Sequence, residues 1–238
     1  MKKLAILFSL LISACASSGG HDQVSSGMGK LPLDYSEATT VEEIRQLKPQ
    51  SKLPLNIAVM PPKGWRSELT FEERKVIKGW EEELKEIGFV NWLQIVPKSL
   101  IPECHYRRSD RECFFNDSRV AGARMKADAI LFLNASSVTE EYVNPLSILN
   151  LSVVGMWFAP AHHRDTNSIY EAALFDVNNG YLYAVSEGQG EYKSLRPYMY
   201  ADSDTGEAEA KKMALDDLGK QLIALAKDHV SKNIALGK

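Results

Sequence analysis

The 238-residue sequence has only three cysteines, no basic tract and no long apolar run after its first residues. A formal net charge of −3 without a lysine or arginine cluster excludes the electrostatic footprint of a nucleic-acid-binding protein. No apolar run reaches the length of about 18 residues that a membrane-spanning helix needs. No G-x-S-x-G motif and no phosphate-binding glycine loop is present, so the common signatures of hydrolases and nucleotide-binding enzymes are missing.

The amino-terminal residues have the pattern of a secretion signal. Lys2 and Lys3 precede an apolar stretch at residues 4–12, and small residues follow it. This stretch is too short to cross roughly 30 Å of hydrocarbon as a helix. We therefore expect residues 1–14 to be a signal peptide that is removed on export.

The cysteine that follows this signal, Cys15, resembles the lipobox of bacterial lipoproteins. The resemblance implies that the Cys15 sulfur carries a diacylglycerol and that the new amino terminus is acylated. This covalent lipid is the only cofactor that we expect. In Gram-negative lipoproteins an aspartate after the cysteine commonly signals inner-membrane retention, so Ala16 indicates the periplasmic face of the outer membrane. The alternative is an ordinary secretory signal with a cysteine at this position by chance.

The other two cysteines, Cys104 and Cys113, bracket a short polar stretch. In an oxidising periplasm we expect them to form a disulfide that closes a short loop. Two free thiols are one alternative. A zinc site is another, but it needs two further ligands, and only His105 lies nearby in the sequence.

The sequence predicts an α/β domain at residues 53–238, preceded by a flexible tether at 15–30 and by a short helix and linker at 31–52. The domain should begin in the order β-α-β-α-β and continue with antiparallel strands, which gives a mixed sheet with helices packed on it. A strong hairpin signal, Asn178-Asn179-Gly180, lies between two of these strands. The predicted elements are strands at 55–60, 92–97, 127–134, 147–160, 168–177 and 181–192, and helices at 41–47, 71–87, 117–127 and 207–233.

Local signals mark the ends of several predicted helices. Thr40 and Thr70 each begin a capping box, and Gly88 is expected to end the helix at 71–87. We expect Asp117 to cap the helix at 117–127, with Val120, Ala123 and Ala127 facing inward. The glycines in the segment 187–191 are expected to form a bulge at a strand edge.

Several of these segments together resemble the rhombotarget lipoproteins of bacteria. The segments are LPLNIAVMPP, VVGMWFAPAHHRDT, EAALFDVNNGYLY and the closing helix. The β-α-β-α-β start resembles more distantly the curli-secretion lipoprotein and the amino-terminal domain of the Tol translocation protein. The chain lacks the Gly-rich carboxy-terminal sorting signal expected of rhombotarget lipoproteins. The resemblance implies an envelope lipoprotein and carries no catalytic residues.

His162, His163 and Asp165 form the one cluster of metal-ligating type that the sequence suggests. Adjacent histidines on a strand point to opposite faces, so they bind one ion only where the chain turns sharply. The alternative is a polar turn at a strand end, which the Asp165 side chain would stabilise.

Aromatic residues concentrate in the predicted antiparallel strands and in the loop after them. Core packing is the first explanation for this cluster, which includes Met156, Trp157, Phe158, Tyr181, Tyr183 and the loop residues Tyr198, Met199 and Tyr200. The alternative is that Tyr198, Met199 and Tyr200 are exposed and contact a partner. We expect a lipid-anchored binding or assembly module of the cell envelope without catalytic activity, whose partner is an envelope protein. The alternative is an envelope hydrolase or metal-binding protein that uses His162, His163 and Asp165.

Overall fold

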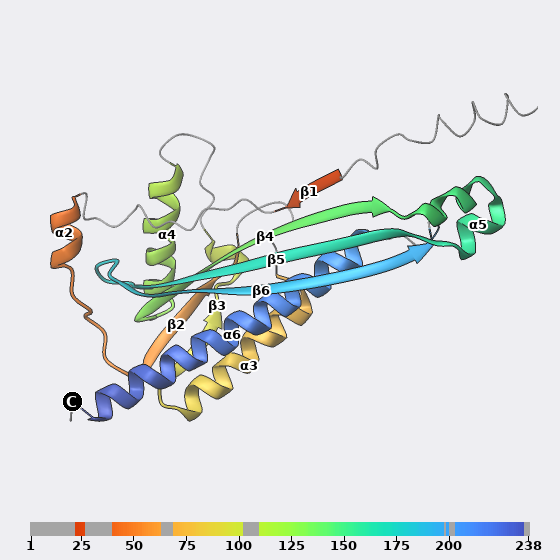
Figure 1. The fold of residues 1–238 in the computed structure, drawn as a ribbon. Coiled ribbons are helices and arrows are strands. Elements are labelled where there is room, and N and C mark those ends of the chain that lie inside the picture. Colours follow the sequence, from red (N-terminus) through yellow and green to blue (C-terminus); the bar gives the residue numbers. More distant parts are fainter. Residues whose placement is uncertain are drawn as a thin grey trace, which may run out of the picture.

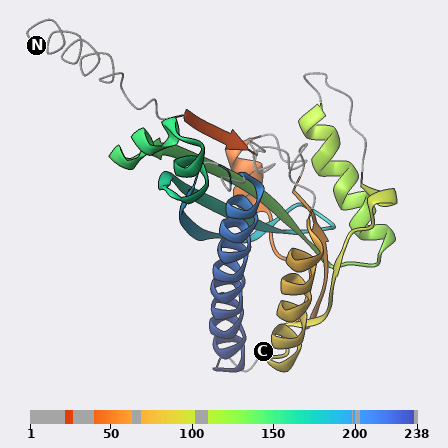
Figure 2. The same cartoon turned by 90° about the vertical axis from the view of Figure 1, so that its right-hand side faces the viewer.

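A mixed sheet with helices on both faces forms the protein, which confirms the predicted α/β fold (Figures 1 and 2). The computed structural model describes residues 22–26, 40–62, 69–101, 110–197, 199 and 203–235. The strands are β1 (Asp22–Ser26), β2 (Leu55–Met60), β3 (Val90–Ile95), β4 (Ala129–Val143), β5 (Pro160–Asp176) and β6 (Leu182–Pro197). The α-helices are α2 (Val41–Gln46), α3 (Phe71–Glu86), α4 (Asp110–Arg124), α5 (Val153–Phe158) and α6 (Ser203–Ala235), and the 3-10 helices are η1 (Lys98–Leu100) and η2 (Pro145–Leu151).

The strands follow the order β3-β2-β4-β5-β6, with β1 paired to β4 beside this path. β2 runs parallel to β3 and to β4, whereas β5 runs antiparallel to both β4 and β6. The hairpin between β5 and β6 turns at the predicted site, where Gly180 has a φ of 73°. Positive φ favours glycine, because a side chain at such a position meets the backbone.

Local sequence signals explain the first helices. Thr70 and Glu73 form a reciprocal capping box at the start of α3, and Thr40 with Glu43 does the same for α2. After α3, Gly88 adopts a φ of 71° and ends the helix. Among the described helices, none combines the length and the apolar character that crossing a membrane requires.

Two apolar cores lie on opposite faces of the sheet. On one face, α3 and α6 cover side chains such as Leu131 and Leu174. On the other face, α4 covers Phe132 and Phe175, and Phe115 of this helix stacks on Phe132 with a ring-centroid distance of 5.6 Å. Figure 2 shows the sheet between these helices.

The prediction for α4 was partly wrong. This helix begins at Asp110, so Asp117 lies inside it and is exposed and does not cap its start. Val120 and Ala123, which we expected to face inward, are exposed, while Phe115 and Ala121 are buried. The face of α4 that packs on the sheet therefore includes Phe115 and Ala121, and Val120 and Ala123 lie outside it.

The strand predicted at residues 147–160 is also wrong. This segment forms η2 and α5, and β5 begins only at Pro160. The run is apolar enough for a buried strand, but its polar residues act as helix caps: Leu146 N donates to the Asn144 side chain, and Gly155 N donates to the Ser152 hydroxyl at 3.0 Å.

Glycines bring α6 unusually close to β6. A Cβ at Gly188 or Gly190 would overlap backbone atoms of α6, at Ala214 and Leu218 or at Ala210 and Ala214 respectively. We expected a bulge at this point of an edge strand. β6 is an edge strand of the sheet, but its pairing with β5 is regular here, and the glycines serve the close approach of α6 instead.

One strand lies within the segment expected to be a flexible tether. β1 pairs with the outer part of β4, with Asp22 opposite Glu141 and Ser26 opposite Ser137. β2 pairs with β4 only along residues 129–132, so β1 covers a part of the same edge that β2 does not reach. Covering an otherwise open strand edge protects its backbone groups from pairing with another chain.

Candidate interaction site at the strand tips

The three long strands β4, β5 and β6 extend beyond α3, and at their far end the chain forms a small helical lobe. We call residues 144–158, which comprise η2 and α5, the tip lobe. Figure 1 shows α5 at one extreme of the molecule and the carboxy terminus at the other. Within the tip lobe, neither η2 nor α5 has a buried residue.

Exposed apolar side chains dominate the tip lobe. The exposed fraction is 87% for Leu151, 78% for Phe158 and 73% for Val153. No Asp, Glu, Lys or Arg occurs from Val143 to Ala161. The other exposed large apolar residues of the lobe are Leu146, Ile148, Leu149, Val154 and Trp157. A contiguous exposed apolar patch is a typical mark of an interaction site.

Small polar residues give the tip lobe a defined fold. The Ser152 hydroxyl donates to Leu149 O at 2.9 Å and accepts from Gly155 N at 3.0 Å. Asn144 closes the base of the lobe, because its backbone N donates to Ala161 O at 3.0 Å and its side chain donates to Pro160 O at 3.1 Å. Backbone groups at the helix ends are thus satisfied within the lobe, while its apolar side chains remain outside.

Of the three predicted contact residues, Met199 is within the described part of the chain and follows β6. Pro197 at the end of β6 pairs with Pro160, which lies two residues after the tip lobe. Met199, two residues further on, is 46% exposed. Tyr198 and Tyr200 lie outside the described residues. The sequence therefore predicts contacts near this end of the molecule, but in the segment after β6 and not in the tip lobe.

His162, His163 and Asp165 do not converge. All three lie in β5, where His162 points to the opposite face from His163 and Asp165. His163 stacks on Tyr142 with a ring-centroid distance of 4.7 Å, and the Tyr142 hydroxyl donates to Asp165 at 3.4 Å. Across the described parts of the chain, no group of three or more His, Cys, Asp or Glu residues is placed to hold a metal ion.

Ionisation at this cluster follows from burial and neighbouring charge. Partial burial lowers the pKa of His162, so its imidazole is neutral near pH 7. Desolvation and the nearby Asp165 carboxylate raise the pKa of Tyr142, so its phenol keeps its proton. These pKa directions fit a polar strand surface, in which Tyr142 donates a hydrogen bond and His162 carries no charge.

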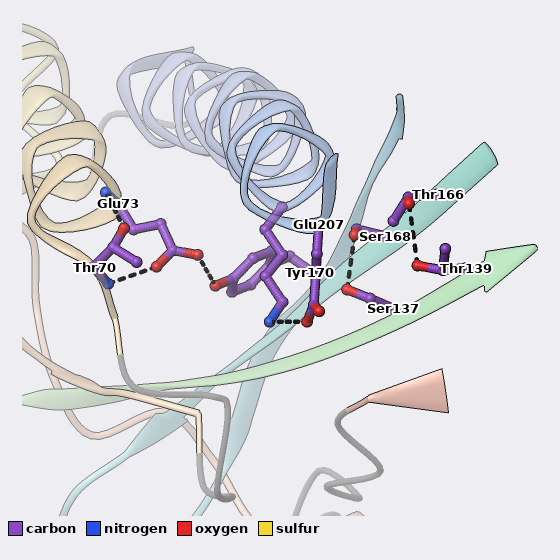
Figure 3. A network of polar contacts seen from close by, with 9 residues as sticks. Thr70, Glu73, Ser137, Thr139, Thr166, Ser168, Tyr170 and Glu207 are labelled. Atoms are coloured by element: carbon purple, nitrogen blue, oxygen red, sulfur yellow. Dashed lines mark hydrogen bonds and ion pairs between the residues drawn. The ribbon is translucent and has the colours of Figure 1, made fainter. Parts of the chain in front are cut away.

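A polar network lies between the outer sheet and α6 (Figure 3). Ser137 and Ser168 pair through their hydroxyls at 2.8 Å, and Thr139 and Thr166 pair at 3.1 Å. Each pair joins facing residues of β4 and β5. These hydroxyls therefore bond one another across the two strands, and the network is part of the packing between sheet and helix.

Two further contacts extend this network toward the helices. The buried Tyr170 hydroxyl donates to Glu73 Oε1 at 2.7 Å, while Thr70 N donates to Glu73 Oε2 at 2.6 Å. Burial and the Glu73 carboxylate raise the pKa of Tyr170 far above its ordinary value, so the phenol stays protonated and keeps donating. On α6, Lys211 and Glu207 form an ion pair at 2.6 Å.

At the opposite end of the sheet, Asp176 holds the linker that precedes β2. Its fully buried carboxylate accepts from the Tyr183 hydroxyl at 2.6 Å, from Gln50 N at 3.0 Å and from Asn178 N at 2.8 Å. Burial alone would raise the pKa of Asp176, but these donors outweigh it and lower the pKa. The same contact raises the pKa of Tyr183 to about 12, with burial as the first cause.

The predicted modification sites receive no structural account. Cys15 and Cys104 lie outside the described residues, and only the backbone is described at Cys113. The lipid and the disulfide therefore stay predictions. A hollow of about 330 Å³ lies between η1 and α4 and is lined by Ser99, Leu100, Ile101, Asp117, Val120, Ala121 and Arg124.

No family model and no curated protein matches the chain. Among solved structures, the PelC dodecamer from Paraburkholderia phytofirmans is 13% identical, with a TM-score of 0.30, and the match covers 87% of this chain and 96% of that one. Lipoprotein GNA1162 from Neisseria meningitidis is 14% identical, with a TM-score of 0.30 and coverage of 75% and 99%. The hypothetical protein CT253 from Chlamydia trachomatis is 11% identical, with a TM-score of 0.27 and the same coverage. Such low TM-scores establish no shared family, so function has to be argued from the residues of this chain.

Sequence reasoning missed the tip lobe as a surface feature, although two signals for it are present. Asn144-Pro145 marks a turn, and Ser152 precedes Gly155 in the spacing of a helix cap. The strongest signal is the charge-free stretch itself. A short apolar run of this kind fits a buried strand equally well by periodicity, and only the three-dimensional placement separates the two.

Proposed function

We propose that this protein is a lipid-anchored module of the bacterial cell envelope that acts through surface contacts. Its anchor is an acylated Cys15 on the periplasmic face of the outer membrane. Its contact site is the tip lobe together with the neighbouring Met199. The proposal assigns no catalytic residue.

The pairing of β1 with β4 is the observation that carries this proposal. Because the two strands are antiparallel, the amino-terminal end of β1, at Asp22, lies beside Glu141, near the end of β4 that leads into the tip lobe. The leader with Cys15 therefore joins the domain at the end where the exposed apolar side chains gather (Figure 1). An anchor and an interaction surface at one end suit a protein that works at a membrane.

Replacement of Cys15 tests the anchor. Cys15→Ser removes the acyl-acceptor sulfur, so a metabolically supplied fatty-acid probe should label the wild-type chain and not the variant. Fractionation of the envelope should place the labelled wild-type protein with the outer membrane. Equal labelling of both chains, or labelling of neither, would rule the anchor out.

A further inference from the structure

We infer that the partner of the tip lobe is the lipid leaflet that holds the anchor, and that the lobe inserts its apolar side chains into this leaflet. The inference rests on the anchor at Cys15 proposed above and names what the contact site binds. The protein would then touch its membrane twice, through the acyl chains and through the folded domain.

The chemistry of the tip lobe suits a lipid interface. Removing an unpaired charge from water is strongly unfavourable, and the stretch from Val143 to Ala161 carries no charged side chain to remove. The groups it does expose are large and apolar, with Leu151, Val153 and Phe158 each more than 70% exposed. The side chains of Ser152 and Asn144 hydrogen-bond backbone groups at the helix ends, at Leu149 O, Gly155 N and Leu146 N, which lowers the penalty of moving the lobe out of water.

The dimensions of the lobe suit insertion into one leaflet. η2 has seven residues and α5 has six, whereas a helix that crosses the hydrocarbon needs about 20. Helices that lie in the membrane interface bury their apolar face about 5–10 Å deep, at the boundary of headgroups and acyl chains. The tip lobe is therefore suited to this boundary layer.

The reach of the leader places the same membrane at the lobe. Asp22 lies seven positions after Cys15, and a fully extended chain of seven steps spans at most about 25 Å. Asp22 lies opposite Glu141, only two residues before the end of β4 at Val143. An acylated Cys15 thus holds the tip end of the sheet near the leaflet surface.

Tethering makes even weak insertion effective. Once the acyl chains hold the protein, contact between lobe and leaflet is an intramolecular event at high effective concentration. The lobe then does not need to bind vesicles strongly by itself, and its role is to fix how the domain sits on the membrane.

The composition of the lobe favours lipid over a protein partner. Protein interfaces combine an apolar centre with a polar rim, and arginine is enriched in them. The lobe has no arginine and no charged rim of its own, and its exposed apolar residues are spread over both η2 and α5. It offers little with which to recognise one particular protein surface.

Fluorescence of Trp157 in the reconstituted lipoprotein tests the inference. The acyl-labelled full-length protein is placed in vesicles of phosphatidylethanolamine and phosphatidylglycerol that contain lipids brominated at different depths. Four tryptophans are present, so the signal of Trp157 is the difference between the wild-type protein and Trp157→Phe. We expect quenching that is strongest with bromines near the headgroups, because the lobe reaches only the boundary layer.

Two matched phenylalanines supply the variant and its control. Phe158 in the lobe is 78% exposed, and Phe71 at the start of α3 is 79% exposed. Phe158→Glu should reduce the quenching of Trp157 at least several-fold, because it places a charge in the lipid-facing surface. Phe71→Glu should leave it unchanged. Both sites are exposed, and equal melting temperatures will verify that both variants fold.

The outcomes separate this inference from the proposed anchor. Labelled protein whose Trp157 is quenched, with loss of quenching in Phe158→Glu alone, supports insertion. Labelled protein whose Trp157 no brominated lipid quenches would overturn insertion and leave the anchor standing. Absence of the acyl label would overturn the anchor itself. Protection of Trp157 that rises with protein concentration and ignores the lipids would assign the lobe to a second copy of the chain and contradict the inference.

Discussion

Along β4 and β5 the protein changes from an apolar interior to a polar one. Near the start of β4, Leu131 and Leu133 point toward α3 and α6, whereas further along the same face Ser137 and Thr139 take their place. At the outer end the usual arrangement is reversed: hydroxyl groups are buried, whereas the apolar side chain of Leu151 is 87% exposed.

The inner half of the sheet and the tip lobe differ in how much they contribute to stability. The inner half of the sheet carries apolar cores on both faces, and burial of such side chains is the main source of folding free energy. The outer half is held by strand pairing, by α6 and by β1. The tip lobe adds no buried residue in η2 or α5 and is therefore free to serve contact.

A pair of leucines tests the contrast most directly. Leu131 is 3% exposed and Leu151 is 87% exposed. Leu131→Ala should lower the free energy of unfolding by about 2–5 kcal/mol, because it leaves a cavity in the core. Leu151→Ala should change it by less than about 0.5 kcal/mol. Urea denaturation of both variants measures this, and similar losses would show that the lobe contributes to the core.

Two glycines distinguish close packing from simple helix propensity. Gly188→Ala should lower the free energy of unfolding by about 3 kcal/mol, since the new methyl group overlaps the α6 backbone at Ala214 and Leu218. Gly79→Ala should raise it by up to about 1 kcal/mol, because Gly79 is an exposed helical position with open space around it. Thermal unfolding of the two variants provides the measurement. A neutral Gly188→Ala would contradict the close approach of α6 and β6.

The buried hydrogen bond of Tyr170 makes a smaller contribution. Tyr170→Phe leaves one oxygen of the buried Glu73 carboxylate without its donor, and we expect a loss of about 1–3 kcal/mol. Tyr181→Phe is the control, because Tyr181 packs through its ring against Tyr183 at a centroid distance of 5.3 Å and keeps that ring. Chemical denaturation should separate the two, and equal stability of both variants would show that the bond contributes nothing.

The stabilising effect of Asp176 should depend on pH. Its pKa is lower in the folded protein than in the unfolded chain, so its ionised form stabilises the fold above about pH 4. This stabilisation is lost as the pH falls through the folded pKa. We expect Asp176→Asn to be less stable by about 1–2 kcal/mol at pH 7, with a difference that narrows as the pH falls below about 4. Unfolding curves measured across this range will show it, and a gap that widens in acid would refute the assignment.

The inner half was largely predictable from sequence because its signals are local. Capping boxes at Thr40 and Thr70, the Gly88 cap and the Asn178-Asn179-Gly180 turn all lie where predicted, and the mixed sheet follows from the order of elements. The register of β1 on β4 was not predictable. It joins residues more than 100 positions apart, and the polar sequence of β1 carries no strand pattern of its own.

Burial was harder to predict than secondary structure. Trp157 and Phe158 were expected in the core because large apolar residues usually lie there, yet they are 41% and 78% exposed. The glycines of β6 were interpreted as a bulge, because the sequence alone does not show that α6 lies on them. In both cases the deciding information is which element packs on which, and this emerges only with the tertiary fold.

The length of α6 has a consequence for architecture at the membrane. This helix runs back along β6 from the tip end, and its 33 residues extend about 50 Å. Because α6 is continuous, the proposed insertion of the tip lobe would hold the far end of the domain at a fixed distance from the leaflet. The turn at Asn178-Asn179-Gly180 and α2 lie toward that far end, opposite α5 (Figure 1). The length of α6 would then set the distance between the membrane and the far end of the domain.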